Sequence, residues 1–86
     1  MKQFDYTITD ELGIHARPAG MLAKVAKSFG ETVVTISKDG NEVKASQLMK
    51  LMNMKVKKGD VITVCASGGE EEAAITELEK FFKENL

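Results

Sequence analysis

The chain has 86 residues, enough for one small domain with a modest hydrophobic core, and residues 1–86 are taken as that single domain. Hydrophobic residues make up 43% and charged residues 29% of the chain, which argues against disorder. The formal net charge of −1 gives no general attraction to nucleic acid or to an anionic membrane. No signal peptide and no apolar run near the length of a membrane span is evident, so we expect a cytoplasmic protein.

The cysteine and histidine content argues against disulfide and metal chemistry. Cys65 is the only cysteine, so no intrachain disulfide can form, and its apolar neighbours predict a buried thiol. With one histidine and no cysteine cluster, neither a structural zinc site nor any other metal site is expected.

The first third of the chain predicts a strand followed by a helix. Residues 3–9 alternate between apolar and polar side chains, which is typical of a half-buried strand. A turn over residues 10–13 leads into the helix, and Gly30 supplies its stop. The apolar positions of this helix recur with helical spacing at Ala19, Leu22, Ala23, Ala26 and Phe29.

The middle of the chain predicts a hairpin and a short helix. Residues 32–37 are rich in β-branched side chains and predict a second strand. Asp39-Gly40 favours a tight turn, after which residues 41–44 return as a short third strand. Ser46 is a candidate cap for the second helix, whose apolar residues Leu48, Leu51 and Met52 share one face.

The last third predicts a strand and a long helix. Residues 61–66 alternate as a fourth strand, which Ser67-Gly68-Gly69 ends. The acidic run 70–72 falls in the first turn of the final helix, where carboxylates suit the helix dipole. A broad apolar stripe then runs to the end of the chain through Ala74, Ile75, Leu78, Phe81 and Phe82.

The predicted element order is therefore βαββαβα, an α+β arrangement without internal repeats. Four strands and three helices of this length cannot cover both faces of a sheet. We expect the three helices on one face and solvent on the other. Periodicity alone does not distinguish the strand order 1-4-2-3 from a ferredoxin-like order.

One stretch gathers the rarest residues of the sequence at the predicted start of the first helix. His15, Arg17 and Pro18 are the only histidine, arginine and proline, and they fall within four residues. Proline is tolerated in the first turn of a helix, so His15 is expected at or next to the N-cap. The helix N-terminus at Ala16, Arg17 and Pro18, with its unpaired N–H groups and the Arg17 guanidinium, is therefore expected to bind an anion such as phosphate.

These positive groups disfavour the imidazolium form of His15, so a neutral and nucleophilic ring is expected. If the ring attacks a phosphoryl group, the helix amides and Arg17 would stabilise the negative oxygens. Such transfer requires no nucleotide-binding loop, metal or cofactor. A histidine in this position can equally be a capping or surface residue.

The motif itself resembles a known family. The segment Gly13-Ile14-His15-Ala16-Arg17-Pro18-Ala19 is similar, residue for residue, to the active-site motif of the HPr family, the histidine-containing phosphocarriers of the bacterial phosphoenolpyruvate–sugar phosphotransferase system. The resemblance extends over nearly the whole chain, including the later segment Lys58 to Val64. It implies an open-faced β-sandwich with antiparallel strand order 1-4-2-3, and a carrier rather than a stand-alone catalyst.

The resemblance also implies partners, with enzyme I as the phosphoryl donor and sugar-specific enzyme IIA domains as the acceptors. The protein itself is expected to be a monomer. In the family an apolar patch with basic flanks docks these partners, and acidic-rimmed surfaces are its complement. In this sequence the patch corresponds to Gly20, Lys24, Lys27, Gln47, Leu48, Met49 and Lys50, around His15 and Arg17.

A regulatory serine of Gram-positive members does not carry over directly. In those relatives the serine phosphorylated by an HPr kinase directly precedes the apolar pair of the second helix. Here Gln47 precedes Leu48-Met49, and Ser46 lies one residue earlier. Kinase control through Ser46 is therefore doubtful, and capping is the preferred role for Ser46.

Two other functions fit the sequence less well. A family member can act as a regulatory module that docks to transcription factors or enzymes without carrying phosphate, but such paralogues lack the histidine that this chain keeps as His15. A hydrolase using His15 with Ser46 and an aspartate would need a nucleophile motif and an oxyanion hole, which the sequence does not offer.

Overall fold

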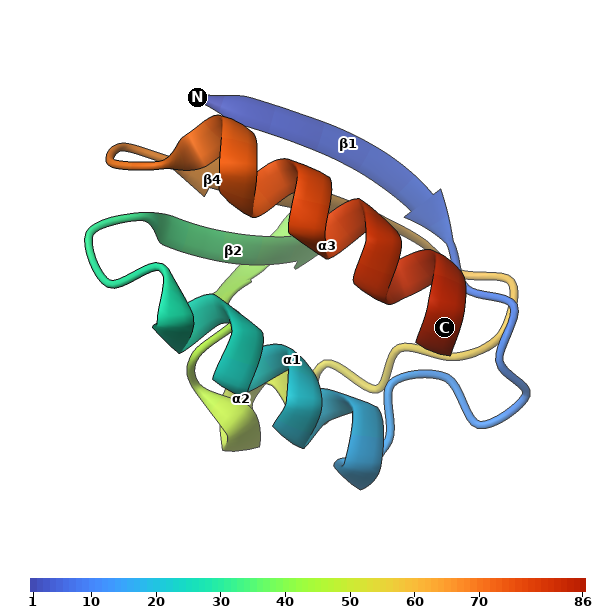
Figure 1. The fold of residues 1–86 in the computed structure, drawn as a ribbon. Coiled ribbons are helices and arrows are strands. Elements are labelled where there is room, and N and C mark those ends of the chain that lie inside the picture. Colours follow the sequence, from blue (N-terminus) through green and yellow to red (C-terminus); the bar gives the residue numbers. More distant parts are fainter.

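Four strands and three helices follow one another in the predicted order βαββαβα in the computed structural model, which describes residues 1–86 (Figure 1). All seven elements lie within three residues of the expected bounds. They are β1 (Lys2–Thr7), α1 (Ala16–Ser28), β2 (Val33–Lys38), β3 (Asn41–Lys44), α2 (Leu48–Asn53), β4 (Val61–Ser67) and α3 (Glu71–Asn85).

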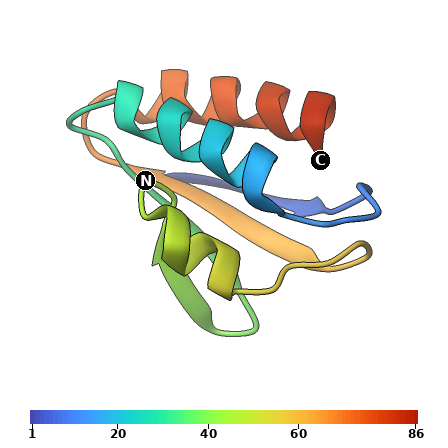
Figure 2. The same cartoon turned by 90° about the horizontal axis from the view of Figure 1, so that it is seen from below.

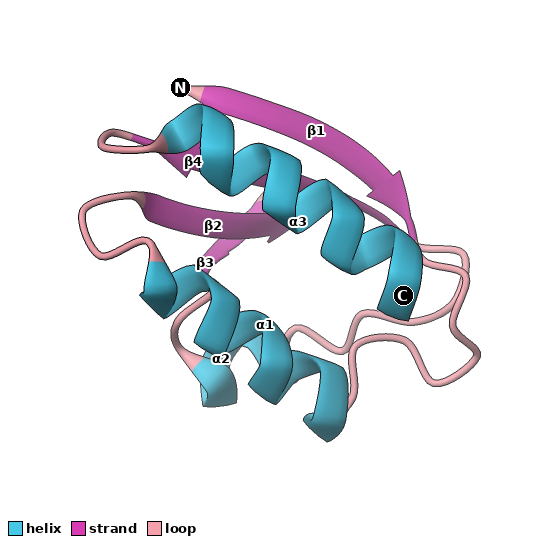
Figure 3. Cartoon of the chain, in the orientation of Figure 1, coloured by secondary structure: helices cyan, strands magenta, loops and turns pink.

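The four strands form one antiparallel sheet in the order β1-β4-β2-β3, as the resemblance implied. Figure 3 shows the helices gathered on one side of this sheet. α3 packs on β1 and β4, and α2 packs beside α1 next to β3 (Figure 2). The sheet is open, because β1 and β3 form its two edges.

The core lies between the sheet and the helices, because side chains alternate along the strands. Ile62, Val64 and Ala66 of β4 are fully buried, as the period of two predicts. From α3, Phe82 packs its ring against Phe4 and Tyr6 of β1. Each large side chain buried in this way contributes about 1.5–3 kcal/mol.

The opposite face of the sheet is exposed, and this corrects the prediction for Cys65. Val61 is 57% exposed and Val33 is 48% exposed on that face. Cys65 lies on the same face, between Gln3 and Thr35 of the neighbouring strands, and is only half-buried. The apolar run suggested a buried thiol, but the strand alternation that buries Val64 and Ala66 turns Cys65 outward.

The predicted cap of α2 is also wrong by one residue. The N-cap is Gln47, and its side chain makes no capping hydrogen bond. The Ala45 N–H donates to Val34 O at 2.9 Å, which continues the β2–β3 pairing, and the Gln47 N–H donates to Lys44 O at 3.0 Å, which closes a turn. Ser46 lies inside this turn, so the helix begins after it.

A second turn ties the sheet to the loop before β4. The carboxylate of Asp60 accepts hydrogen bonds from the Lys38 ammonium at 2.8 Å and from the Lys57 N–H at 2.8 Å. The Lys38 hydrogen bond, aided by the Lys57 N–H, lowers the pKa of Asp60.

No helix of the structure is both long and apolar enough to cross a membrane.

Candidate functional site

His15 is the N-cap of α1, as the proline pattern predicted. Its backbone is extended, with φ −101° and ψ −175°, and its carbonyl accepts the Ala19 N–H at 2.9 Å. The imidazole makes no capping hydrogen bond, and its side chain is 36% exposed. The ring is therefore held at the start of the helix by its backbone, and neither ring nitrogen makes a hydrogen bond within the protein.

The loop before His15 is fixed by a close approach between two backbone segments. Gly13 has φ +66°, and its N–H donates to Asp10 O at 3.0 Å. The Ile14 N–H donates to Val56 O at 3.1 Å, and the Ile14 side chain is buried in the core. Only a residue without Cβ fits here, because a Cβ on Gly13 would lie 2.0 Å from Val56 O. The position of His15 therefore depends on Gly13.

The start of α1 leaves two amides free. Ala16 and Arg17 donate no hydrogen bond, whereas the Ala19 N–H is already bonded to His15 O. Pro18 has no N–H; its ring is buried, so it supports the first turn without donating to a ligand. The Arg17 side chain makes no ion pair. Two amides and one free guanidinium therefore lie beside His15, which is a suitable arrangement for an anion.

His15 and Arg17 line a shallow cavity of 320 Å³ that also involves residues the sequence did not indicate. Glu84 and Asn85 reach it from the last turn of α3, which ends beside the start of α1 (Figure 2). No local pattern could have indicated them, because they are about 70 residues away along the chain. Met21 and Asp10 also line this cavity, and Asp10 Oδ1 lies 4.0 Å from His15 Nε2.

The expected docking residues lie on two adjacent helices. Lys24 and Lys27 are exposed on α1, whereas Gly20 is half-buried. On α2, Met49 is 68% exposed and Leu48 is 38% exposed, and Gln47 and Lys50 are also exposed. Of the three apolar residues expected to share a face, Leu51 is fully buried and Met52 packs against the core. Leu48 lies at the rim of that face.

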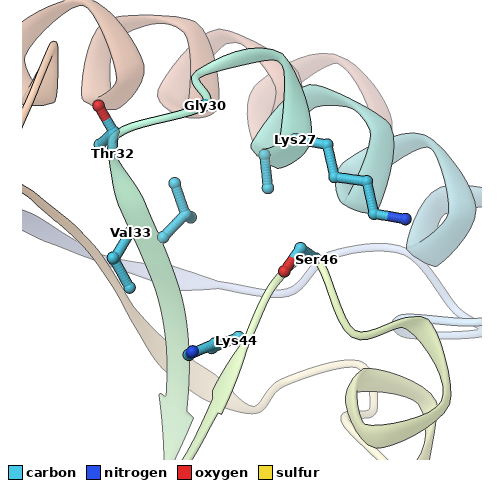
Figure 4. A pocket seen from close by; sticks show the side chains of 8 residues that line it. Lys27, Gly30, Thr32, Val33, Lys44 and Ser46 are labelled. Atoms are coloured by element: carbon cyan, nitrogen blue, oxygen red, sulfur yellow. The ribbon is translucent and has the colours of Figure 1, made fainter.

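The structure places Lys27 far from His15. It lies about 18 Å along the helix axis from His15. There it lines a second cavity of 260 Å³ between α1, β2 and β3, together with Lys44 and Ser46 (Figure 4). The ammonium groups of Lys27 and Lys44 point in opposite directions in this view. The Thr32 hydroxyl at its edge already accepts the Glu70 N–H at 2.8 Å. This cavity therefore presents no convergent donors.

Two further apolar side chains add to the exposed surface near His15. Leu12 is 71% exposed in the preceding loop, and Met21 is 41% exposed on α1. An apolar residue between Glu11 and Gly13, in an otherwise polar turn, was the only sequence signal for Leu12. Exposed apolar side chains beside a reactive group are typical of a docking surface.

Comparison with known proteins gives a consistent result. The family model described as the PTS HPr component phosphorylation site matches residues 2–84. The phosphocarrier protein HPr of Mycoplasma genitalium is 34% identical over 85 residues, covering 99% of this chain and 97% of the relative. A solved structure of a histidine-containing phosphocarrier protein, described in relation to the divergence of Mycoplasma, superposes with a TM-score of 0.92 at 34% identity and covers 96% of this chain and 93% of its own. An HPr dimer from Thermoanaerobacter tengcongensis superposes with a TM-score of 0.76 at 32% identity, with 98% and 95% covered.

Proposed function

Since this chain belongs to the HPr family of phosphocarrier proteins, we propose that His15 accepts a phosphoryl group from one protein and passes it to another. The observation that carries this proposal is the exposed imidazole at a helix start with two free amides and an unpaired guanidinium beside it. A neutral ring nitrogen is a nucleophile, and these donors suit the negative oxygens that the reaction brings to it.

The transfer step needs only the protein's own groups. The lone pair of an imidazole nitrogen attacks phosphorus, a P–N bond forms, and the bond from phosphorus to the donor breaks with its electron pair leaving on the donor. The phosphoryl oxygens then accept hydrogen bonds from the amides of Ala16 and Arg17 and from the Arg17 guanidinium. Transfer to the acceptor is the same step in reverse, so no cofactor is consumed.

The proposed partners are enzyme I as donor and sugar-specific enzyme IIA domains as acceptors, with the protein acting as a monomer in the cytoplasm. Exposed Met49 and Leu48 support an apolar contact, and Lys24 and Lys50 give it a basic rim. Acidic-rimmed partners would complement this surface. A purely regulatory binding module is the weaker proposal, because it would leave the phosphate-binding geometry at His15 without a use.

Kinase control through Ser46 is not part of the proposal. Ser46 lies half-buried in the turn before α2, and Gln47 directly precedes Leu48-Met49. Without a hydroxyl at position 47, this chain offers an HPr kinase no serine in the position used by Gram-positive relatives.

The function is tested by incubating the protein with phosphoenolpyruvate and enzyme I and measuring its intact mass. We expect one added phosphoryl group that is lost in acid and kept in base, because a P–N bond breaks readily once the nitrogen is protonated. Fragmentation should place the group on His15. A phosphoryl group that survives acid, or one located on a serine, would contradict the proposal.

The docking surface is tested by Met49→Glu. We expect association with enzyme I to weaken on the order of a hundredfold, because a carboxylate would be placed in an apolar contact facing an acidic rim. The Tm should change little, since Met49 is 68% exposed. Titration calorimetry measures the first effect and thermal unfolding the second.

Val61→Glu is the matched control for Met49→Glu. Val61 is 57% exposed, but it lies on the uncovered face of the sheet, away from α1 and α2. This variant should therefore bind enzyme I normally. Equal weakening by both substitutions would show that net charge matters and that the contact does not involve α2.

A further inference from the structure

Asp10 is held in place by the main chain on three sides. Its N–H donates to Leu86 O at 3.0 Å, and its carbonyl accepts the Gly13 N–H at 3.0 Å. Its Oδ1 accepts the Leu12 N–H at 2.8 Å. A carboxylate anchored in this way keeps its direction, whereas a free surface aspartate samples several rotamers.

The same Oδ1 faces one particular nitrogen of His15. It lies 4.0 Å from Nε2, and no other acidic side chain lies within ion-pair distance of the ring. Of the other charged groups in this cavity, Arg17 and Glu84 form no ion pair within 4.0 Å. Glu11 faces Lys58 instead, at 3.9 Å. The negative charge closest to the imidazole is therefore fixed on its Nε2 side.

We propose that Asp10 is a positioning residue for phosphoryl transfer, a role that rests on the proposed function of His15. Its carboxylate keeps the ring proton on Nε2 and so leaves the lone pair on Nδ1. The proton of a neutral imidazole is placed by the group that its nitrogen faces, and a carboxylate favours the N–H next to it. A ring with the opposite tautomer would present an N–H where the nucleophilic lone pair is needed.

The same contact assists the transfer step. The Nδ1 lone pair attacks phosphorus, the P–Nδ1 bond forms, and the bond to the donor breaks with its electron pair leaving on the donor. The ring now holds the phosphoryl group on Nδ1 and the proton on Nε2, and it carries a positive charge. Asp10 offsets the positive charge of the ring, while Arg17 offsets the negative charge of the phosphoryl oxygens. When the phosphoryl group moves on, the ring leaves as neutral imidazole with its proton still on Nε2.

The test compares Asp10→Ala, Asp10→Asn and Glu11→Gln with the wild type. Nitrogen-15 spectra of the histidine ring at alkaline pH, where the ring is neutral, report the tautomer directly. We expect the Nε2–H form to dominate in the wild type and to fall about tenfold relative to the Nδ1–H form in Asp10→Ala. Asparagine keeps an oxygen acceptor but loses the charge, so Asp10→Asn should be intermediate.

Transfer kinetics with phosphorylated enzyme I give the second readout. In Asp10→Ala, kcat should fall about 10- to 100-fold with little change in KM, because the nucleophile changes and the docking surface does not. Glu11→Gln is the matched control: it removes the neighbouring charge from the same loop, and its glutamate side chain is 88% exposed, so it should behave as the wild type.

The outcomes separate the two proposals. A wild-type protein that accepts no phosphoryl group refutes the proposed function, whereas the tautomer ratio still tests Asp10. An unchanged tautomer ratio in both Asp10 variants refutes the role of Asp10 while phosphorylation of His15 stands. The same change in Glu11→Gln, or an effect on KM alone, would also overturn it. If Asp10→Ala does not fold, the Asp10→Asn spectrum decides, because asparagine can still accept the Leu12 N–H.

Discussion

Arg17→Ala is expected to accept the phosphoryl group about 100 to 1,000 times more slowly than the wild type, whereas His15→Ala should accept none. In the proposed reaction, Arg17 supplies charge and a planar set of donors for the phosphoryl oxygens, whereas the attacking nitrogen belongs to His15. Both side chains are exposed or half-buried, so neither variant should unfold. Rapid-quench measurement of phosphoryl transfer from enzyme I gives the rates, and thermal unfolding checks the fold.

Arg17→Lys distinguishes the shape of the guanidinium from its charge. A lysine keeps the positive charge as a single point and loses the bidentate geometry, so only part of the rate should return. Equal rates for arginine, lysine and alanine would show that Arg17 only covers the surface. A phosphorylated His15→Ala protein would place the phosphoryl group elsewhere.

Gly13→Ala is expected to destabilise the protein by about 3 kcal/mol and to lower the Tm by about 15 °C. Its φ of +66° disfavours any residue with a Cβ, and the added Cβ would meet Val56 O at 2.0 Å. Since the atoms that the added Cβ would meet, in Val56 and Lys57, all belong to the backbone, no side chain can move aside to make room. The shift should also break the hydrogen bond from Ile14 to Val56 and displace His15, so transfer should slow in the fraction that remains folded.

Gly20→Ala is the matched control for this prediction. Gly20 has no atom within 4 Å of an added Cβ, and it lies inside α1. Alanine has the higher helix propensity, so this variant should be more stable by about 0.5–1 kcal/mol. Chemical denaturation of the two variants measures the contrast. If both destabilise equally, the close approach at Gly13 is not what fixes the loop.

Local sequence was sufficient for much of the fold, because each element is encoded by neighbouring residues. The Asp39-Gly40 turn and strand β3 (Asn41–Lys44) lie where the pattern placed them, with Asp39 at φ 50° and Gly40 at φ 84°. His15 at the N-cap follows from Pro18 in the first turn. Helix α2 was less well determined, because its first residue depends on how Ala45 pairs with β2.

Strand order and the exposure of Cys65 needed more than a local pattern. An apolar run can face a core on either side, so only the side of the sheet that the helices cover decides that Cys65 points outward. The order β1-β4-β2-β3 was implied by the family resemblance and not by periodicity. Both depend on contacts between residues far apart in the sequence, which a residue's neighbours do not encode.

The sequence by itself determined the proposed reactive group of this protein: His15 at a helix start, Arg17 beside it and Pro18 in the first turn. Only the tertiary structure decided what surrounds that group. It places Asp10 at 4.0 Å from Nε2, brings Glu84 from α3 into the same cavity, and packs Gly13 against Val56. The physical reason is that capping and helix dipoles act within one turn, whereas the direction of a ring and its neighbouring charges are set by packing across the whole domain.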